Sequence, residues 1–371
     1  MLRRGRTRPN RPVPATGAWI LVGMRVATRV TVALLTAGTV ALAGCIGTPG
    51  SASGTTDGAS GTAGGAKPTS GSPHPADPPV PVRPGRRAPV PSHPIGSASI
   101  AGCPLFPPDN PWRRDISHLP ASPRSAAWVA SIGSGRFLHP DFGSNPSYGI
   151  PYSVVPAGQP KVAVRFTAYG DESDPGPYPI PPTARIESGG DAHVLVASGD
   201  CHLYELYGAV HSASGWTAQS GAVFNLTSDA LRPAGWTSAD AAGLPILPGL
   251  VRRDEVLAGH IDHALRFTVA TSQRGYLSPA THQAGSTTDP NVPPMGARFR
   301  LKASFDLSRY HGAARIVLQC LKTYGMFVAD NGSNWFLSGA TDSQWDDTDL
   351  DQLKSVPGSA FEAVDTGPVH S

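Results

Sequence analysis

Residues 191–207 read DAHVLVASGDCHLYELY, and this stretch predicts the fold most directly. Both halves are rich in β-branched and aromatic residues, which favour strands. The Ser-Gly-Asp between them suits a three-residue hairpin turn in which the glycine relaxes the backbone. With this turn the facing pairs are Ala197 with Cys201, Leu195 with Leu203, and His193 with Glu205. A two-residue turn would instead place Glu205 on the face opposite His193.

Further strand signals lie on both sides of this hairpin. Apolar and polar residues alternate over 161–168, 260–269 and 298–303, as half-buried strands require. The strands are short, prolines are frequent, and strands do not alternate with helices along the chain. The predicted class is therefore mainly β: a β-sandwich or jelly-roll-like domain with a few helices at its margin.

Helices are predicted at few places. Residues 123–132 follow Ser122, a good N-cap, and begin with proline. Residues 313–324 carry apolar side chains at helical spacing and end at Gly325. Short helical turns are expected at residues 238–242 and 252–258.

The N-terminal region indicates export. Leu42-Ala43-Gly44-Cys45 ends an apolar run and resembles the lipobox of bacterial lipoproteins, in which Cys45 becomes the lipidated first residue. Residues 1–44 are thus predicted to be a signal peptide, with Met24 as an alternative start. A membrane-spanning helix is disfavoured, because the apolar run 30–43 is shorter than the roughly 20 residues that cross a bilayer.

Residues 45–102 form a predicted tether, and residues 103–371 a single β-rich domain. The tether is almost entirely Gly, Ser, Thr, Ala and Pro, and so cannot bury a core. The net charge of +3 comes largely from arginines in the signal peptide and tether. Basic residues are scattered singly over the domain, which argues against nucleic acid as a partner.

Three cysteines remain after lipidation of Cys45. Cys320 lies on the apolar face of the predicted helix 313–324 and is expected in the core. Cys103 and Cys201 are therefore the expected disulfide in an exported protein. A catalytic thiol is not expected, because nothing around Cys320 would activate it.

The candidate catalytic residues are His193, Glu205, His263, Asp191 and Asp262. An imidazole opposite a carboxylate has a raised pKa and a fixed tautomer, as an acid/base pair requires. On a solvated face, the same His193–Glu205 pair would be only a surface ion pair. A glycosidase needs a second carboxylate, for which Asp191 or Asp262 is available. Alternation places His263 on an apolar face, either as a satisfied core histidine or in a pocket wall.

No motif indicates a metal or a cofactor. The sequence lacks HxH and HExxH spacings, the Gly-x-Ser-x-Gly elbow, phosphate loops and dinucleotide fingerprints. Aromatic residues in predicted loops could stack on sugar rings, although tryptophans at sheet ends are more often part of the core. The candidates for stacking are Trp112, Tyr178, Trp216, Trp236 and Trp335.

The domain resembles an uncharacterised family of secreted proteins and lipoproteins of actinobacteria and other soil bacteria. The resemblance spans most of residues 103–365. It rests on FPPDNPW (106–112), DESDPGPYPIP (171–181), WTSADAAGLP (236–245), IDHAL (261–265) and KTYGM (322–326). It implies export and a shared domain, but no reaction and no catalytic residues.

Two functions are consistent with these features. The first is a lipoprotein on the outer face of the cell membrane whose β-rich domain acts on a polysaccharide or cell-wall glycan, as a hydrolase or lyase. In that case Glu205 and His193 are the acid/base pair. The second is a non-catalytic envelope lipoprotein that binds glycan or a partner protein. A concave site with converging ionisable groups would favour the enzyme.

Overall fold

The computed structural model describes residues 98–371. The predicted signal peptide, the lipidation site Cys45 and the tether up to residue 97 lie outside the described residues. Within residues 98–371, no helix has the length and apolar character that crossing a membrane requires.

The folded chain extends N-terminal to the predicted boundary at Cys103. Strand β1 (Ser99–Ile100) pairs with β2 (Cys103–Pro104), and Ile100 is buried in the main core. Residues 98–102 thus belong to the domain and not to the tether, because pairing with β2 gives the apolar Ile100 a place to be buried.

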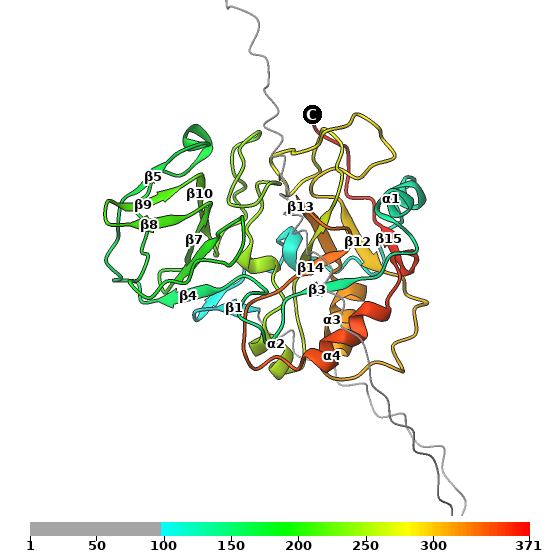
Figure 1. Cartoon of the computed structure of the whole chain (residues 1–371). Coiled ribbons are helices and arrows are strands. Elements are labelled where there is room, and N and C mark those ends of the chain that lie inside the picture. The colour runs from blue at the N-terminus through cyan, green and yellow to red at the C-terminus, as the bar shows by residue number, and fades with distance from the viewer. Residues whose placement is uncertain (1–97) are drawn as a thin grey trace, which may run out of the picture. The chain divides into compact units, whose positions relative to one another are not determined.

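A four-stranded sheet contains the predicted hairpin (Figure 1). Its order is β10 (Ser220–Asn225), β7 (His202–Tyr207), β6 (Val194–Ser198) and β4 (Tyr152–Val155). The β10–β7 and β7–β6 pairs are antiparallel, and β4 runs parallel to β6.

Both faces of this sheet are buried, as its alternating side chains require. One face contributes Leu195, Ala197 and Leu203 to the main core. The other face contributes Val194, Val196 and Tyr204 to a smaller core. A three-stranded sheet of β5 (Val164–Phe166), β9 (Gly215–Ala218) and β8 (Val210–Ser212) supplies further side chains to this smaller core.

The hairpin register differs from the predicted one. The facing pairs are Val194 with Leu206, Leu195 with Glu205, Val196 with Tyr204, and Ala197 with Leu203. The loop is residues 199–201, and its left-handed residue is Cys201, with φ of 62°, rather than Gly199. A three-residue loop typically consists of a type I turn followed by one left-handed residue. Because Cys201 is that residue, the loop is 199–201, and Ala197 faces Leu203 instead of Cys201. The predicted facing of His193 and Glu205 is therefore wrong.

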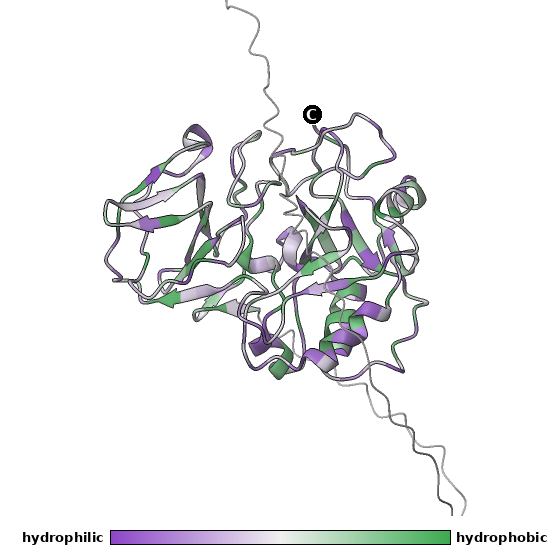
Figure 2. Ribbon diagram, viewed as in Figure 1, coloured by the Kyte–Doolittle hydropathy of each residue, from purple (hydrophilic) through white to green (hydrophobic). Residues whose placement is uncertain are grey.

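A six-stranded sheet forms the other half of the main core. Its order is β15 (Phe361–Ala363), β12 (Arg298–Leu301), β13 (Met326–Asn331), β11 (Leu265–Val269), β14 (Phe336–Ser338) and β3 (His139–Asp141). Strands β11 and β13 are parallel, as are β14 and β3. Figure 2 shows hydrophobic residues gathered in these central strands.

The helices are short and lie at the margin. They are α1 (Ser125–Ile132), α2 (Arg253–Ala258), α3 (Gly312–Thr323) and α4 (Asp347–Asp351). Short 3-10 turns cover Pro111–Arg113, Gly170–Glu172, Leu247–Gly249, Gln352–Ser355 and Gly358–Ala360. The predicted turn of helix at residues 238–242 is absent, because the Ser238 hydroxyl and Asp240 carboxylate bind nearby backbone groups instead. The prediction of a mainly β, sandwich-like domain with few helices is confirmed.

Candidate functional site

Two adjoining hollows are lined by polar residues from both halves of the domain. The larger has a volume of about 390 Å³ and the smaller about 270 Å³, within the usual range of ligand sites or close to it. The larger is walled by Asp141, by residues from 147–150 and 187–193, by Arg266 and Thr268 of β11, and by residues from 330–338. Asp191, Asp330 and Asn331 line both hollows, and so mark the place where they meet.

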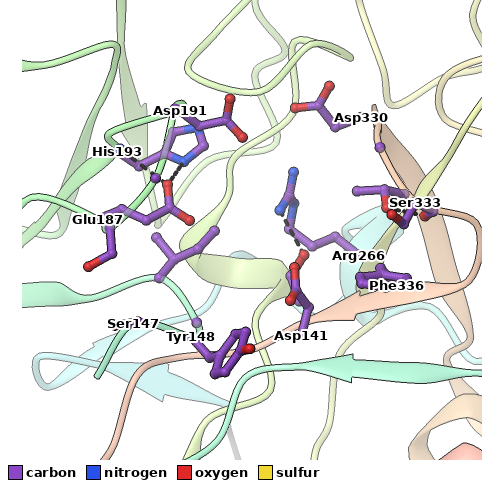
Figure 3. Close-up of a pocket in the computed structure, with 18 of the residues that line it drawn as sticks. Asp141, Ser147, Tyr148, Glu187, Asp191, His193, Arg266, Asp330, Ser333 and Phe336 are labelled. Atoms are coloured by element: carbon purple, nitrogen blue, oxygen red, sulfur yellow. Dashed lines mark hydrogen bonds and ion pairs between the residues drawn. The ribbon is translucent and has the colours of Figure 1, made fainter. Parts of the chain in front are cut away.

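Two carboxyl groups face each other at this junction. Figure 3 shows Asp191 and Asp330 on opposite walls, with their carboxyl groups directed toward one another. Asp191 is exposed and lies just before β6, whereas Asp330 is half-buried near the end of β13. Chain segments far apart in sequence thus bring two acids to one opening.

The surroundings of Asp330 favour its protonated form. Burial, together with the charge of Asp240 and against the opposing charge of Arg266, raises the pKa of its carboxyl to about 6. The backbone N–H of Asn331 donates to its Oδ1 at 2.7 Å. A carboxyl group with this pKa is protonated in a substantial fraction of molecules near neutral pH, and so can act as a general acid.

A buried ion pair joins the two hollows, because Arg266 lines the larger one and Asp240 the smaller one. Arg266 Nη2 and Nε donate to Asp240 Oδ2 at 2.7 and 3.1 Å, and Nη1 donates to Ser338 Oγ at 2.9 Å. Burial alone would lower the pKa of Arg266, but the charge and hydrogen bond of Asp240, together with the charges of Asp330 and Glu187, raise it. Arg266 therefore carries a permanent positive charge close to Asp330.

His193 forms a second ion pair in the wall, with Glu187. The ring Nδ1 contacts Glu187 Oε2, and Nε2 donates to the Ala239 carbonyl at 3.1 Å. Burial alone would lower the pKa of His193, but the hydrogen bond and charge of Glu187 raise it. Because both ring nitrogens face acceptors, the ring is held as an imidazolium.

Asp141 lies in the larger hollow only, at the end of β3. Loss of hydration raises the pKa of its carboxyl, although the residue stays exposed overall. Tyr148 lines the same hollow with 54% of its surface exposed, and Phe336 lines it from β14. The larger hollow thus has aromatic side chains beside its carboxylates.

Glu205 lies outside both hollows. It is fully buried, and its two carboxylate oxygens accept from the backbone N–H of Ile246 at 2.9 and 3.0 Å and of Leu247 at 2.8 Å. Burial raises its pKa to about 7. Glu205 therefore anchors the loop before the Leu247–Gly249 turn, and the partner of His193 is Glu187 instead.

His263 is a satisfied core histidine. The predicted strand over 260–269 begins only at Leu265, so His263 precedes it. Its ring is fully buried, and its Nε2 contacts both carboxylate oxygens of Glu255 at 3.0 and 3.1 Å. It lines neither hollow, so the pocket-wall alternative does not hold for this residue.

Asp262 also lies away from the junction. Its Oδ2 is 3.4 Å from His260 Nε2, and it lines a separate small hollow beside α2. Of the predicted catalytic residues, the structure thus brings together only His193 and Asp191.

Most of the predicted sugar-stacking residues belong to the core. Trp112, Tyr178 and Trp335 are almost completely buried, because their rings pack against other aromatic rings. None of the three lines either hollow of the site. Trp216 and Trp236 are half-buried and line neither hollow, with Trp216 stacked on His211.

The predicted disulfide between Cys103 and Cys201 is present, and Cys320 is free and buried in α3 as expected. The thiol of Cys320 donates to the His263 carbonyl at 3.1 Å. Burial raises the pKa of this thiol well above its ordinary value. Cys320 is thus an unreactive core residue.

Four residues that line the larger hollow were not predicted as site residues from the sequence: Asp330, Arg266, Asp141 and Glu187. One signal was available: Asp330 opens the turn-forming stretch DNGSN (330–334) directly after an apolar strand, a common place for functional polar residues. Glu187 and Asp141 stand in stretches with no distinguishing pattern. Within residues 98–371, no three His, Cys, Asp or Glu side chains are grouped as a metal site would require.

No protein-family model, curated protein or solved structure matches this chain.

Proposed function

We propose that this protein is a hydrolase that cleaves a glycosidic bond held where the two hollows meet. One observation carries the proposal: the carboxyl groups of Asp191 and Asp330 face each other across that junction, and burial raises the pKa of Asp330 to about 6. Glycosidases use such a pair, one acid kept protonated by its surroundings and one carboxylate left ionised.

In this proposal Asp330 is the general acid. It transfers its proton to the glycosidic oxygen as the bond from that oxygen to the anomeric carbon breaks. Asp191 acts from the other wall, either by removing a proton from the attacking water or by bonding to the anomeric carbon before water releases the sugar. Both routes consume one water. In the covalent route Asp330 regains its proton from that water, whereas in the direct route the proton is left on Asp191 and Asp330 is reprotonated by exchange with solvent.

The neighbouring charged residues hold this pair in place. Arg266 lies close enough to Asp330 to lower its pKa in part, so that the acid can also release its proton. The ring of His193, fixed by Glu187 and the Ala239 carbonyl, holds the wall beside Asp191 in one arrangement. These ion pairs make the walls rigid before a substrate arrives.

A polymer suits two hollows better than a small metabolite does. Sugar units on either side of the scissile bond would occupy one hollow each, and Tyr148 and Phe336 could stack on the sugar in the larger one. A lipid anchor at Cys45 would place the domain outside the cell membrane, within reach of polysaccharide or cell-wall glycan.

Turnover of a polysaccharide panel by the purified domain tests this proposal. We expect Asp330→Asn and Asp191→Asn to lower the turnover number at least 10²-fold while the circular dichroism spectrum stays native. Asp109→Asn is the control, since Asp109 is exposed and lines neither hollow. Full activity in Asp330→Asn would contradict the proposal.

The alternative is a non-catalytic lipoprotein that binds glycan. Glycan binding by the wild type with no turnover of any polysaccharide, and equal binding by the Asp330→Asn variant, would favour it.

A further inference from the structure

The charges around the larger hollow do not balance. Its two positive groups are already neutralised: Arg266 by Asp240, and His193 by Glu187. Asp141, Asp191 and Asp330 also line it, and none of them forms an ion pair with another residue of the described part of the chain. The surplus charge in the hollow is therefore negative.

Asp191 and Asp330 each have a role in the proposed reaction at the junction. Asp141 has none, because it lines the larger hollow only. It has no side-chain hydrogen bond to residues 98–371, and loss of hydration already disfavours its charged form. The charges of His139 and Arg266 act on Asp141, but neither residue forms an ion pair with it. A carboxylate that lines a ligand site without an ion pair of its own is suited to bind a cation of the ligand.

We infer that the larger hollow selects a sugar unit carrying a free, protonated amino group, and that Asp141 is the residue that recognises it. This inference rests on the proposed function, whose substrate class it specifies. An ammonium group would pair with Asp141, whereas a uronate would add a further carboxylate among Glu187, Asp191 and Asp330.

The same charges disfavour a lyase reaction. β-Elimination starts from a uronic acid unit, whose carboxylate must be stabilised as the neighbouring C–H bond breaks. The cations near the junction, Arg266 and His193, are both held by carboxylates, so they are poorly placed to receive that charge.

Equilibrium binding of three short oligosaccharides of equal length tests the inference. The probes are oligomers of glucosamine, of N-acetylglucosamine and of galacturonic acid, the first two differing only at the amine. We expect the glucosamine oligomer to bind roughly tenfold more tightly than the acetylated one, and the galacturonic acid oligomer to bind most weakly. Added salt should reduce this preference.

Two variants test whether Asp141 causes the preference for the glucosamine oligomer. Asp141→Asn should reduce the glucosamine to N-acetylglucosamine affinity ratio to about one. Asp109→Asn, which removes an exposed carboxylate outside the hollow, should keep the wild-type ratio. Equal or tighter binding of the acetylated or uronic oligomer by the wild type overturns the inference, as does an unchanged ratio in Asp141→Asn.

The outcomes separate this inference from the proposed function. The expected affinity order with no turnover supports the amine site and contradicts the hydrolase. Turnover of a neutral glycan without that order supports the hydrolase and overturns the amine site. Failure of all three oligomers to bind overturns the amine site, and turnover of the polysaccharide panel then decides the hydrolase separately.

Discussion

Three aspartates near the site show how surroundings decide what one side chain does. Asp240 is fully buried and serves as the counter-ion of Arg266. Asp191 is exposed at the junction of the two hollows, and Asp330 faces it from a half-buried position. Only Asp330 combines access to the cavity with a pKa raised to about 6. Asp330 differs from Asp191 because it is more buried, and from Asp240 because it forms no ion pair with an arginine of residues 98–371.

At this scale we predict that Asp330→Asn stabilises the folded protein while it removes activity. The folded pKa of about 6 lies above the ordinary value of 3.8, so the folded state binds the proton more tightly. Stability therefore falls as pH rises from about 4 through about 6. Asparagine cannot ionise, so above pH 7 the variant should gain about 1–3 kcal/mol in the free energy of unfolding.

Urea unfolding of both proteins at pH 5 and pH 8 measures this gain. The difference between variant and wild type should be larger at pH 8. Asp109→Asn is again the control and should change stability by less than about 0.5 kcal/mol at either pH. A variant less stable than the wild type at pH 8 would show that the ionised Asp330 is stabilised by its surroundings.

At the scale of elements, the hairpin of β6 and β7 is tied to the N-terminal edge of the domain. Cys201 is the left-handed residue of the hairpin loop, and its disulfide partner Cys103 begins β2. The Leu226 N–H also donates to the Cys201 carbonyl at 2.9 Å. The loop is thus held by a covalent bond and a hydrogen bond from two different segments.

Removal of this disulfide should destabilise the domain. The bond closes a loop with a sequence separation of 98 residues, so the unfolded chain gains much freedom without it. We expect the double variant Cys103→Ala and Cys201→Ala to lose about 2–5 kcal/mol in the free energy of unfolding. Wild-type protein unfolded in the presence of reductant should match the variant. Equal urea midpoints for the variant and the oxidised wild type would count against this account.

At the scale of the whole domain, the Arg266–Asp240 pair links its two halves. Arg266 belongs to β11 of the six-stranded sheet, and Asp240 to the segment that follows β10 of the four-stranded sheet. Their side chains are 4% and 0% exposed. Single removal of Asp240 would leave a buried guanidinium without a counter-ion.

We predict that Asp240→Ala lowers the free energy of unfolding by roughly 3–5 kcal/mol. The double variant Asp240→Leu with Arg266→Met should recover much of that loss, since it removes both charges and fills the space with apolar atoms. A double-mutant cycle by urea unfolding measures the coupling. A loss below about 1 kcal/mol in Asp240→Ala would mean that water reaches the arginine.

Local patterns in the chain predicted several elements closely. The predicted turn of helix 252–258 ends at the same residue as α2, because Gly259 with φ of 88° follows it. The predicted helix 313–324 matches α3 within one residue at each end. Strands were predicted too long: the alternation over 161–168 yields only Val164–Phe166. The end of a strand depends on how far the neighbouring strand extends, and the alternation within one segment carries no information about that neighbour.

The sequence by itself determined the β-rich class, the existence of the hairpin and the pairing of Cys103 with Cys201, because these depend on backbone preference, alternation and a count of residues. Only the tertiary structure decided which groups share the cavity. Asp191 and Asp330 meet although 139 positions separate them along the printed sequence. The choice of Glu187 over Glu205 as the partner of His193 likewise depends on burial and on register, which no local pattern contains.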